Sequence, residues 1–530
     1  MKKPADDTGT IARSASLVSI AVMCSRVLGL VREQAFAMLF GAGFAYDSFV
    51  VAFRIPNLLR DLFGEGALSS AFVAVFSDYD VNRGKEETWR LASNVLVFFA
   101  ILLSGLTLLG MLLAKPLVLL LAPHFARIAN KVELTRQLTV IMFPFLTLVS
   151  LSAVVMGILN TKGRFFVPAM ASSFFNLGSI AGGVGLALLL PRFGQPAIVG
   201  MAIGTLIGGL LQLAGQLPTL RRTGFVFRPR LDLRDPGLRR ILRLMVPAII
   251  GLSATQINIF VNTNFASSLA QGSVSWLNYA FRLVQFPIGV FGVAISIATL
   301  PVISRYAAVK DMTRLKETYV SSLTIAFCLT IPATVGLYVL ARPIIALIFQ
   351  HGNFTALDTI KTAEALSFYA LGLFAYSSVK VMVPVFYALG DTRYPVIGSF
   401  LAVAGNVVII LLNIDALQHR AIALATSCAM ACNFLFLSAV LYRKLQGYSL
   451  SYLFAGLAKV LAAAAIMGGW LTVAQRYLVS GWLHDGMLNQ ITAVLVLVAS
   501  GAALYGLALY VLRLRELNLL VDRLASRLAR

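Results

Sequence analysis

The sequence is poor in charged residues and in cysteine for its length. Only 12% of the 530 residues are Asp, Glu, Lys or Arg, and 59% are hydrophobic, whereas soluble domains are nearer a quarter charged and half apolar. The four cysteines all fall inside apolar segments: Cys24, Cys328, Cys428 and Cys432. These scarcities exclude a large soluble domain, intrinsic disorder and a disulfide scaffold, and they favour cysteines that act as small apolar residues.

Sequence signatures of common enzyme sites are missing as well. The chain contains no G-x-x-x-x-G-K-[ST], H-E-x-x-H or G-x-S-x-G segment, the patterns of phosphate-binding loops, zinc proteases and serine hydrolases. We therefore expect a protein that is not an enzyme, has no catalytic residue and no bound metal, and does not itself hydrolyse ATP. Any transport it performs would draw on an ion gradient, the membrane potential or a partner.

Long apolar runs are what the sequence has in abundance. They predict an all-α polytopic membrane protein with about fourteen transmembrane helices. Six of these runs lie within residues 1–219, six within 244–442 and two within 443–512. The second run, over residues 45–80, is interrupted by Pro56, Gly64 and Gly66, so we expect a broken helix there.

The net charge of +22 is explained by where Lys and Arg lie. With a cytoplasmic N-terminus, the predicted cytoplasmic segments hold 28 of the 44 basic residues and the outer segments hold 9. This asymmetry follows the positive-inside rule and predicts that both termini are cytoplasmic. The basic excess therefore gives no reason to expect a nucleic-acid partner.

Seven basic residues fall inside the predicted spans: Arg26, Arg32, Arg54, Arg60, Arg282, Lys380 and Lys459. An arginine in the bilayer costs at least ~2.5–3.5 kcal/mol on insertion scales, so it normally faces a partner or a water-filled cavity. Lys459 lies near a span end and can snorkel, and Lys380 could do either. The deep arginines are expected to line a cavity; they are Arg26, Arg32, Arg54 and Arg282.

Acidic residues accompany these arginines in the first two spans. Arg26 and Glu33 are seven residues apart on one helix face, and Asp47, Arg54 and Asp61 repeat this spacing. Such ladders can be structural ion pairs, an alternative that stays open for Glu33 and Asp61. Basic charge is nevertheless in surplus, and arginine binds oxyanions bidentately. The broken, charged spans therefore predict a transporter site for an anionic, phosphate-bearing ligand.

The chain also contains an internal repeat. Ala52-Phe53-Arg54 returns 228 residues later as Ala280-Phe281-Arg282, and Pro168 and Ser172 return as Pro395 and Ser399 at an offset of 227. Because each half has an even number of spans, the halves would be parallel repeats. We predict an N-lobe over 1–219, a C-lobe over 244–442 and two extra helices over 443–512. Substrate would bind between the lobes, with Arg54 and Arg282 facing each other.

Two further basic segments lie outside the predicted spans. Residues 221–243 hold eight arginines against Asp232 and Asp235, and the tail 513–530 has leucines on one face among five arginines. Both patterns predict amphipathic cytoplasmic helices, a linker over 220–243 and a tail over 513–530, that lie on anionic membrane lipid. A plain positive-inside anchor explains them equally well.

The charged first spans resemble the MurJ (MviN) family. The resemblance rests on short segments in both halves: Ser25-Arg26-Val27-Leu28-Gly29, Val31-Arg32-Glu33, Asp47-Ser48-Phe49, Arg54-Ile55-Pro56-Asn57-Leu58-Leu59-Arg60, Glu65-Gly66-Ala67, Gly272-Ser273-Val274-Ser275-Trp276 and Arg282-Leu283. It extends over essentially the whole chain, including the fourteen-span count.

This resemblance implies a bacterial lipid II flippase of the multidrug/oligosaccharidyl-lipid/polysaccharide exporter superfamily. Such a protein moves the undecaprenyl-diphosphate-linked disaccharide-peptide across the inner membrane for peptidoglycan synthesis. Arg26, Arg32 and Arg282 match the family's cavity arginines, and Arg54 stands where some members have Lys. Polar positions associated with function or gating are matched by Asp47, Arg60, Glu65 and Ser275, and Glu33, Pro56 and Asn57 are expected to support them.

Alternatives of two kinds remain open. Within the superfamily, the protein could be a flippase for another polyprenyl-linked glycan or a cation-coupled drug exporter, although an arginine-rich cavity disfavours cationic drugs. In a different class, it could be a non-transporting scaffold of the cell-wall machinery, whose synthesis proteins are in any case candidate partners. Some family members bind sodium; Asn262, Asn264 and Asn406 are polar residues of the second lobe, but no sodium site can be assigned from them.

Overall fold

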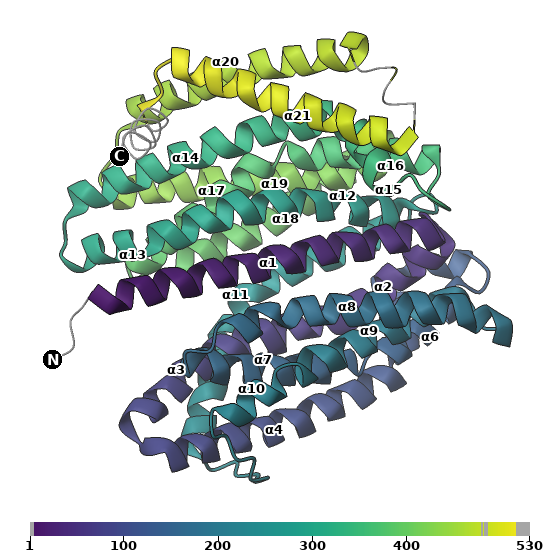
Figure 1. The fold of residues 1–530 in the computed structure, drawn as a ribbon, viewed down its shortest axis with the longest axis vertical. Coiled ribbons are helices and arrows are strands. Elements are labelled where there is room, and N and C mark those ends of the chain that lie inside the picture. Colours follow the sequence, from purple (N-terminus) through teal and green to yellow (C-terminus); the bar gives the residue numbers. More distant parts are fainter. Residues whose placement is uncertain (1–4, 479–480, 482–485, 516–530) are drawn as a thin grey trace. The chain divides into compact units, whose positions relative to one another are not determined.

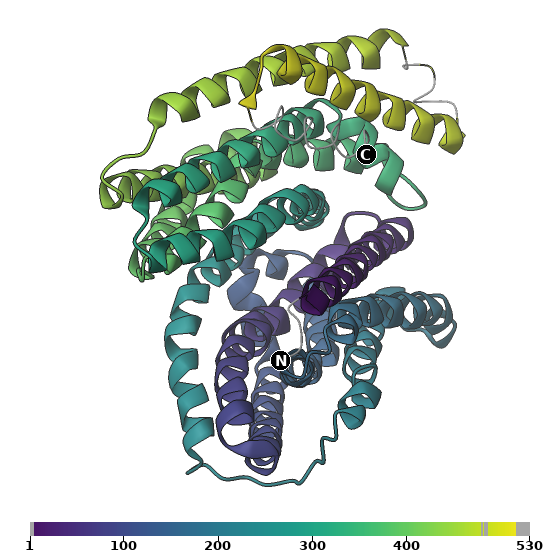
Figure 2. The same ribbon diagram turned by 60° about the vertical axis from the view of Figure 1, so that its left-hand side comes forward.

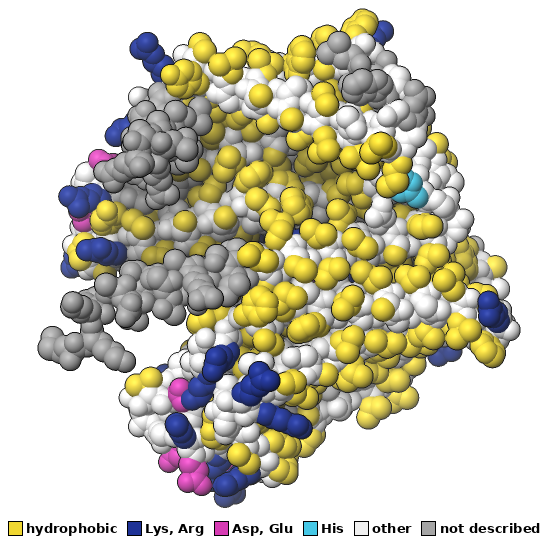
Figure 3. Space-filling view, viewed as in Figure 1, with side chains coloured by type: hydrophobic (Ala, Val, Ile, Leu, Met, Phe, Trp, Pro, Cys, Tyr) yellow, Lys and Arg dark blue, Asp and Glu magenta, His cyan; other side chains and the backbone are white. Residues whose placement is uncertain are grey.

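The computed structural model describes residues 5–478, 481 and 486–515, without the side chains of residues 5–17, 19, 65 and 478. Its elements within these ranges are all helices (Figure 1), which confirms the predicted all-α class. In Figure 3, hydrophobic side chains cover much of the face in view, and most Lys and Arg side chains lie near the edges of that face, above all at the left and at the bottom of the picture. This distribution is expected of a multi-pass membrane protein.

The number of spans is compatible with the prediction. Eleven helices in the described residues are long and apolar enough to cross a membrane, and a bent pair, α16 (Ala356–Ala370) and α17 (Leu373–Ala388), makes a twelfth if it is one span. The first two predicted spans correspond to α1 (Ala5–Phe40) and to a second helix in three pieces. Those pieces are α2 (Phe44–Arg60), the π-helical turn η1 (Asp61–Gly66) and α3 (Ala67–Asn82), so the expected break is present.

The residues divide into two compact units, Met1–Ser275 and Trp276–Arg530. In the first unit α3 is followed by α4 (Gly84–Leu112), α5 (Ala114–Leu121), η2 (Pro123–Arg127), α6 (Lys131–Met142), α7 (Phe145–Thr161), α8 (Phe166–Leu189), η3 (Leu190–Phe193), α9 (Ala197–Ala214), α10 (Leu217–Arg222) and α11 (Pro236–Ser267). Phe72 and Phe76 of α3 pack with Leu91 and Val95 of α4 in its core. Helices α8 and α9 are in close contact, because Gly204 lies where a Cβ would meet the backbone of Gly183.

The second unit begins inside α12 (Ser273–Pro287), whose first turn belongs to the first unit. It continues with η4 (Ile288–Val293), α13 (Ala294–Ala308), α14 (Met312–Val339), α15 (Ala341–Phe349), α16, α17, α18 (Arg393–Leu417), α19 (His419–Lys444), α20 (Leu450–Val473), η5 (Ala474–Leu478) and α21 (Gly486–Val511). Its core is built around buried Tyr319, Leu323 and Val460, which come from α14 and α20.

The predicted parallel repeat is visible in the order of the elements. The two π-helical turns, η1 and η4, begin at Asp61 and Ile288, which are 227 positions apart. The helices that follow them keep nearly the same offset: α3 matches α13, α4 matches α14, and α6 to α8 match α16 to α18. The broken second helix is therefore a feature of the repeating unit.

The boundary between the compact units lies beyond the predicted end of the N-lobe. Helix α11 was expected to open the C-lobe, but its contacts are with α3, α4, α5, η1 and η2 of the first unit. Gly237 near its start is the reason for the close approach, because a Cβ there would meet Leu91 and the Tyr79 ring. The lobes as predicted and the compact units as observed thus differ by one helix.

The basic linker differs from its predicted form. Residues 225–232 contain no helix; only α10 and the start of α11 are helical, so the prediction of one amphipathic helix over 220–243 is wrong. The connection is visible as the long teal stretch at the bottom of Figure 2. It ends at Asp235, whose carboxylate accepts a hydrogen bond from the Leu238 N–H and caps α11. The predicted tail helix over 513–530 lies outside the described ranges, apart from residues 513–515.

Candidate functional site

The Asp47 carboxylate, in the first turn of α2, is the centre of a buried polar cluster. It is 1% exposed and accepts four hydrogen bonds. Two come from the backbone N–H groups of Gly272 (2.9 Å) and Ser275 (3.0 Å), a third comes from Ser275 Oγ (2.6 Å), and the fourth comes from Lys131 Nζ (2.9 Å). Helix N-termini leave their first N–H groups unpaired, and Asp47 satisfies two of these at the start of α12. Two predicted gating residues, Asp47 and Ser275, are therefore brought together from opposite ends of the first unit.

Lys131 is a site residue that the sequence did not reveal. Its side chain is 1% exposed, and its ammonium lies 4.2 Å from the centre of the Phe125 ring and pairs with Asp47. From the sequence, Lys131 is one of the nine basic residues in the predicted outer connecting segments, where a solvent-exposed charge is expected. A buried charge needs a partner, but no spacing rule relates positions 84 residues apart. The sequence around Lys131, which has Glu133 and Arg136 close by, gives no signal that this charge is buried.

A second buried pair lies on α1. Arg32, 9% exposed, donates to the Glu33 carboxylate at 2.9 Å, and the phenol of Tyr46 donates to the same carboxylate at 2.6 Å. The Arg32 guanidinium also lies 5.3 Å from the centre of the Phe175 ring of α8. The open alternative for Glu33, a structural ion pair, is thus what this conformation shows, although the cation is Arg32 and not the residue seven positions earlier.

The break after α2 carries the third polar group. Arg60 donates to Asp61 at 2.6 Å, and Asp61 also accepts from Asn57 (3.3 Å) and from Gln256 of α11 (3.4 Å). Pro56 lies one turn before the break, inside α2. The expected ladder of Asp47, Arg54 and Asp61 is not the observed pairing, because Arg54 donates to Thr263 of α11 and the two acids bind other partners. Asp47 and Arg54 are about two helical turns apart in α2, too far for direct contact, and Pro56 stands between Arg54 and Asp61.

The remaining predicted residues are placed as follows. Arg26 lies half-buried on α1 and forms no ion pair with a described residue. Arg282 lies exposed on α12 within the second unit. The side chain of Glu65, in η1, lies outside the described residues. The expectation that Arg282 joins the other arginines across a cleft remains a prediction.

No group of three or more His, Cys, Asp or Glu side chains in the described part of the chain is arranged to hold a metal ion. Of the three asparagines considered for sodium, Asn264 donates to the Leu120 carbonyl at 3.2 Å, which places it in the first unit. Asn406 is buried in α18. These positions give the sodium hypothesis no assigned site.

Comparison with known proteins shows which family the chain belongs to. The model of the family described as lipid II flippase MurJ matches residues 36–492, which include most of both compact units. The chain belongs to the MurJ family. The lipid II flippase MurJ of Burkholderia cenocepacia is 36% identical over 388 residues, 72% of this chain and 74% of that protein.

Solved structures agree with the family assignment. A lipid II flippase MurJ in an inward closed conformation has a TM-score of 0.75 and 28% identity, and the match covers 91% of this chain and 98% of that one. An inward-facing multidrug transporter of the MATE family has a TM-score of 0.61 at 17% identity over 81% and 95% of the two chains, which shows a shared fold alone. The matched family model and the first of these solved structures both carry the name of a lipid II flippase.

Proposed function

We propose that this MurJ family member flips lipid II, the undecaprenyl-diphosphate-linked peptidoglycan precursor, from the cytoplasmic to the periplasmic leaflet of the inner membrane. The observation that carries the proposal is the family match, which extends over residues 36–492. The chain works by alternating access, with both termini in the cytoplasm, and has no catalytic step. Its energy comes from an ion gradient, with sodium as one candidate ion, from the membrane potential or from a partner.

The deep arginines bind the diphosphate in this proposal. Arg26 is the best placed of them in the described conformation, because it pairs with none of the carboxylates whose side chains the structure describes. Arg32 is held by Glu33 and becomes available to an oxyanion only when that pair opens. Arg54 and Arg282 contribute the planar donors that favour arginine for diphosphates. The surplus of positive charge also disfavours a cationic drug as substrate.

The Asp47 cluster acts as a gate on the outer side. One carboxylate holds Lys131 of α6 and the first turn of α12, so residues from three parts of the chain converge on it. An outward-open state needs α12 to leave Asp47, and the buried N–H groups and the ammonium would then meet water. Closure is favoured while the site is dry, because buried charge-assisted hydrogen bonds are strong.

Substitution of Arg26 and measurement of precursor accumulation test the proposal. Arg26→Ala should abolish complementation of a depleted strain and trap lipid II in the inner leaflet, while the protein inserts at normal levels and keeps its thermal stability. Arg32→Ala should lose function and stability together, because Glu33 then loses its cation. Arg239→Ala is the control, since the side chain of that exposed arginine donates to the Leu233 carbonyl and forms no ion pair with a described residue. Normal precursor exposure with Arg26→Ala would overturn the assigned role, and unchanged precursor levels after depletion of the protein would favour the scaffold alternative.

The orientation is tested separately with cysteines in a background that lacks the native ones. Lys85 and Gln195 are both exposed and lie at opposite ends of the first unit's helices. A cysteine at position 195 should react with an impermeant thiol reagent in intact cells, and one at position 85 should react only after lysis. The reverse labelling pattern would contradict cytoplasmic termini.

A further inference from the structure

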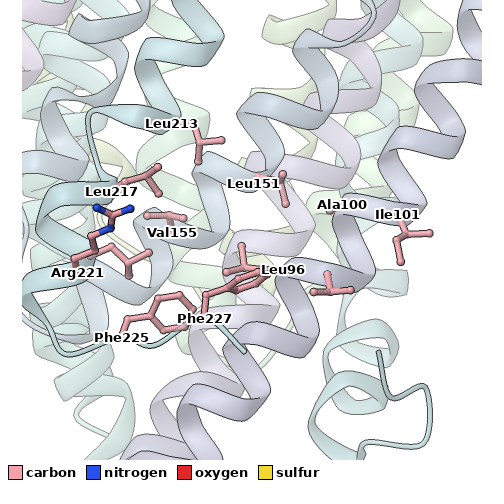
Figure 4. Close-up of a pocket in the computed structure, with 12 residues that line it drawn as sticks. Leu96, Ala100, Ile101, Leu151, Val155, Leu213, Leu217, Arg221, Phe225 and Phe227 are labelled. Atoms are coloured by element: carbon pink, nitrogen blue, oxygen red, sulfur yellow. The ribbon is translucent and has the colours of Figure 1, made fainter. Parts of the chain in front are cut away.

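The first unit contains an apolar pocket apart from the polar clusters. Its volume is about 440 Å³, and eleven of its twelve lining side chains are apolar. Helix α4 supplies Ala100 and Ile101 on one side, and α7, α9, α10 and the chain after α10 supply the other side (Figure 4). Ile101 is 57% exposed and Phe227 is 52% exposed, so the pocket opens to the outside of the first unit.

One wall of this pocket is built by the extended linker, which side chains of α4 hold in place. Ser93 Oγ accepts from the Arg228 N–H at 3.3 Å, and Asn94 exchanges two hydrogen bonds with the backbone of Asp232, at 2.8 and 2.9 Å. Phe225 packs edge-on against Trp89, with ring centres 5.3 Å apart. The linker is therefore a fixed part of the pocket.

Arg221 is the single charged residue that lines the pocket. Figure 4 shows its side chain next to Leu217 and Val155, opposite Ala100 and Ile101. It is exposed and forms no ion pair with a described residue, whereas nearby Arg228 lies 3.5 Å from Glu86. An apolar hole with an uncompensated cation at its edge matches a molecule with a hydrocarbon chain and a negatively charged head.

We propose that this pocket binds an anionic phospholipid of the cytoplasmic leaflet, with an acyl chain against Val155 and Ile101 and the phosphate on Arg221. The charge distribution favours this occupant, because the pocket lies beside the basic segment that the positive-inside rule assigns to the cytoplasm. The bound lipid would bridge α4, α7 and the linker, and would brace the connection that leads to α11. This site is separate from the arginines assigned to lipid II.

Lipid retention by the purified full-length protein tests the proposal. Native mass spectrometry would count dioleoyl phosphatidylglycerol and dioleoyl phosphatidylcholine bound from mixed micelles. Arg221→Gln should weaken phosphatidylglycerol binding about fivefold, the effect of one basic residue at an anionic surface. Ala100→Trp should abolish it by filling the pocket. Two matched controls should bind as the parent does: Arg222→Gln removes an adjacent exposed arginine, and Leu108→Trp adds an indole to the exposed side of the same helix.

The outcomes separate the proposal from its rivals. Equal binding of the two lipids by the parent, or unchanged binding with Arg221→Gln, would overturn it. Displacement of phosphatidylglycerol by undecaprenyl phosphate, lost in Ala100→Trp, would reassign the pocket to the substrate's tail. If Ala100→Trp does not fold, the pair Arg221→Gln and Arg222→Gln still decides. Because no flipping is measured, failure here leaves the proposed function untouched, and failure of that function leaves this site intact.

Discussion

The two broken helices of the repeat have the same order of helical elements but differ in the side chains at the break. In the first unit α2, η1 and α3 follow one another, and in the second α12, η4 and α13 do the same at an offset of 227. The first π-helical turn has the sequence Asp-Leu-Phe-Gly-Glu-Gly and the second Ile-Gly-Val-Phe-Gly-Val. Charged residues are therefore not required to form the π-helical break, because the second unit forms it with apolar residues and glycine. The acidic residues of this turn in the first unit are a feature of that unit alone.

Each broken helix is also linked by a polar contact, its anchor, to a later helix of the repeat, and the two anchors lie at equivalent positions. Lys131 of α6 pairs with Asp47 of α2, and the equivalent position of α16, Asp358, accepts from Trp276 Nε1 of α12 at 2.8 Å. The first contact joins two buried charges, and the second joins one carboxylate to a neutral indole. Equivalent helices are thus linked at equivalent places, but the first link changes its strength far more when it is exposed to water.

The largest expected effect is at the charged anchor. Asp47→Ala leaves Lys131 buried without a counter-ion and removes the acceptor of two α12 N–H groups, so it should destabilise the protein by about 3–5 kcal/mol and abolish function. Asp358→Asn keeps an acceptor for Trp276 but puts an amide NH₂ where the second carboxylate oxygen accepts from the Thr355 N–H, and it should cost about 1–3 kcal/mol. Denaturant unfolding in detergent and complementation measure both. Equal costs at the two anchors would contradict the distinction between them.

Much of the fold was predictable, because the bilayer imposes long apolar runs and the repeat is written into the sequence. The Ala-Phe-Arg and Pro/Ser matches, 227 to 228 residues apart, identify the equivalent helices from the sequence alone. The association of α11 with the first unit was not predictable, since it depends on Gly237 meeting α3 and α4. The linker also looked helical from its charge pattern, but Ser93 and Asn94 of α4 offer its backbone other hydrogen-bond partners.

The site was predictable as a set of residue types and not as a set of pairs. Deep arginines and acids in the first two spans were identified from the cost of burying charge. Their partners come from distant segments, as with Arg54 and Thr263, or from immediate neighbours, as with Arg32 and Glu33. A seven-residue spacing assumes a regular helix, and η1 and Pro56 remove that regularity. Lys131 was missed because a sequence shows where a loop charge stands but not whether it folds inward.

A smaller effect is expected at the bends themselves. In the first unit a Cβ on Gly66 would lie 2.4 Å from Leu252 Cδ1 and 2.5 Å from the Asp61 carbonyl oxygen, so Gly66→Ala should cost about 1–3 kcal/mol. Gly292→Ala in the second unit meets Ser377 at 3.0 Å and should cost less. Thermal unfolding of the two variants measures the difference. A greater loss with Gly292→Ala would show that the apolar bend is the more tightly packed one.

The smallest effect is expected at the equivalent turns before α8 and α18. In the first unit Lys162 pairs with Asp80 and lies 4.7 Å from the Trp89 ring centre; in the second the turn carries the acid, Asp391, which pairs with Lys444 of α19. The hydrogen bond from Lys444 holds the pKa of Asp391 below its usual value of 3.8.

A carboxyl group with a lowered native pKa stabilises the fold above its ordinary pKa and loses that contribution as the pH falls through the native value. Lys444→Met should therefore cost less than about 1 kcal/mol at pH 7, and this cost should be smaller at pH 3, which lies below the usual pKa of Asp391. Lys162→Ala should keep part of its cost at pH 3, because the contact of the ammonium with Trp89 does not titrate there. Unfolding midpoints at pH 7 and pH 3 measure both variants, and a cost of Lys444→Met that is the same at both pH values would show that its contribution is packing and not charge.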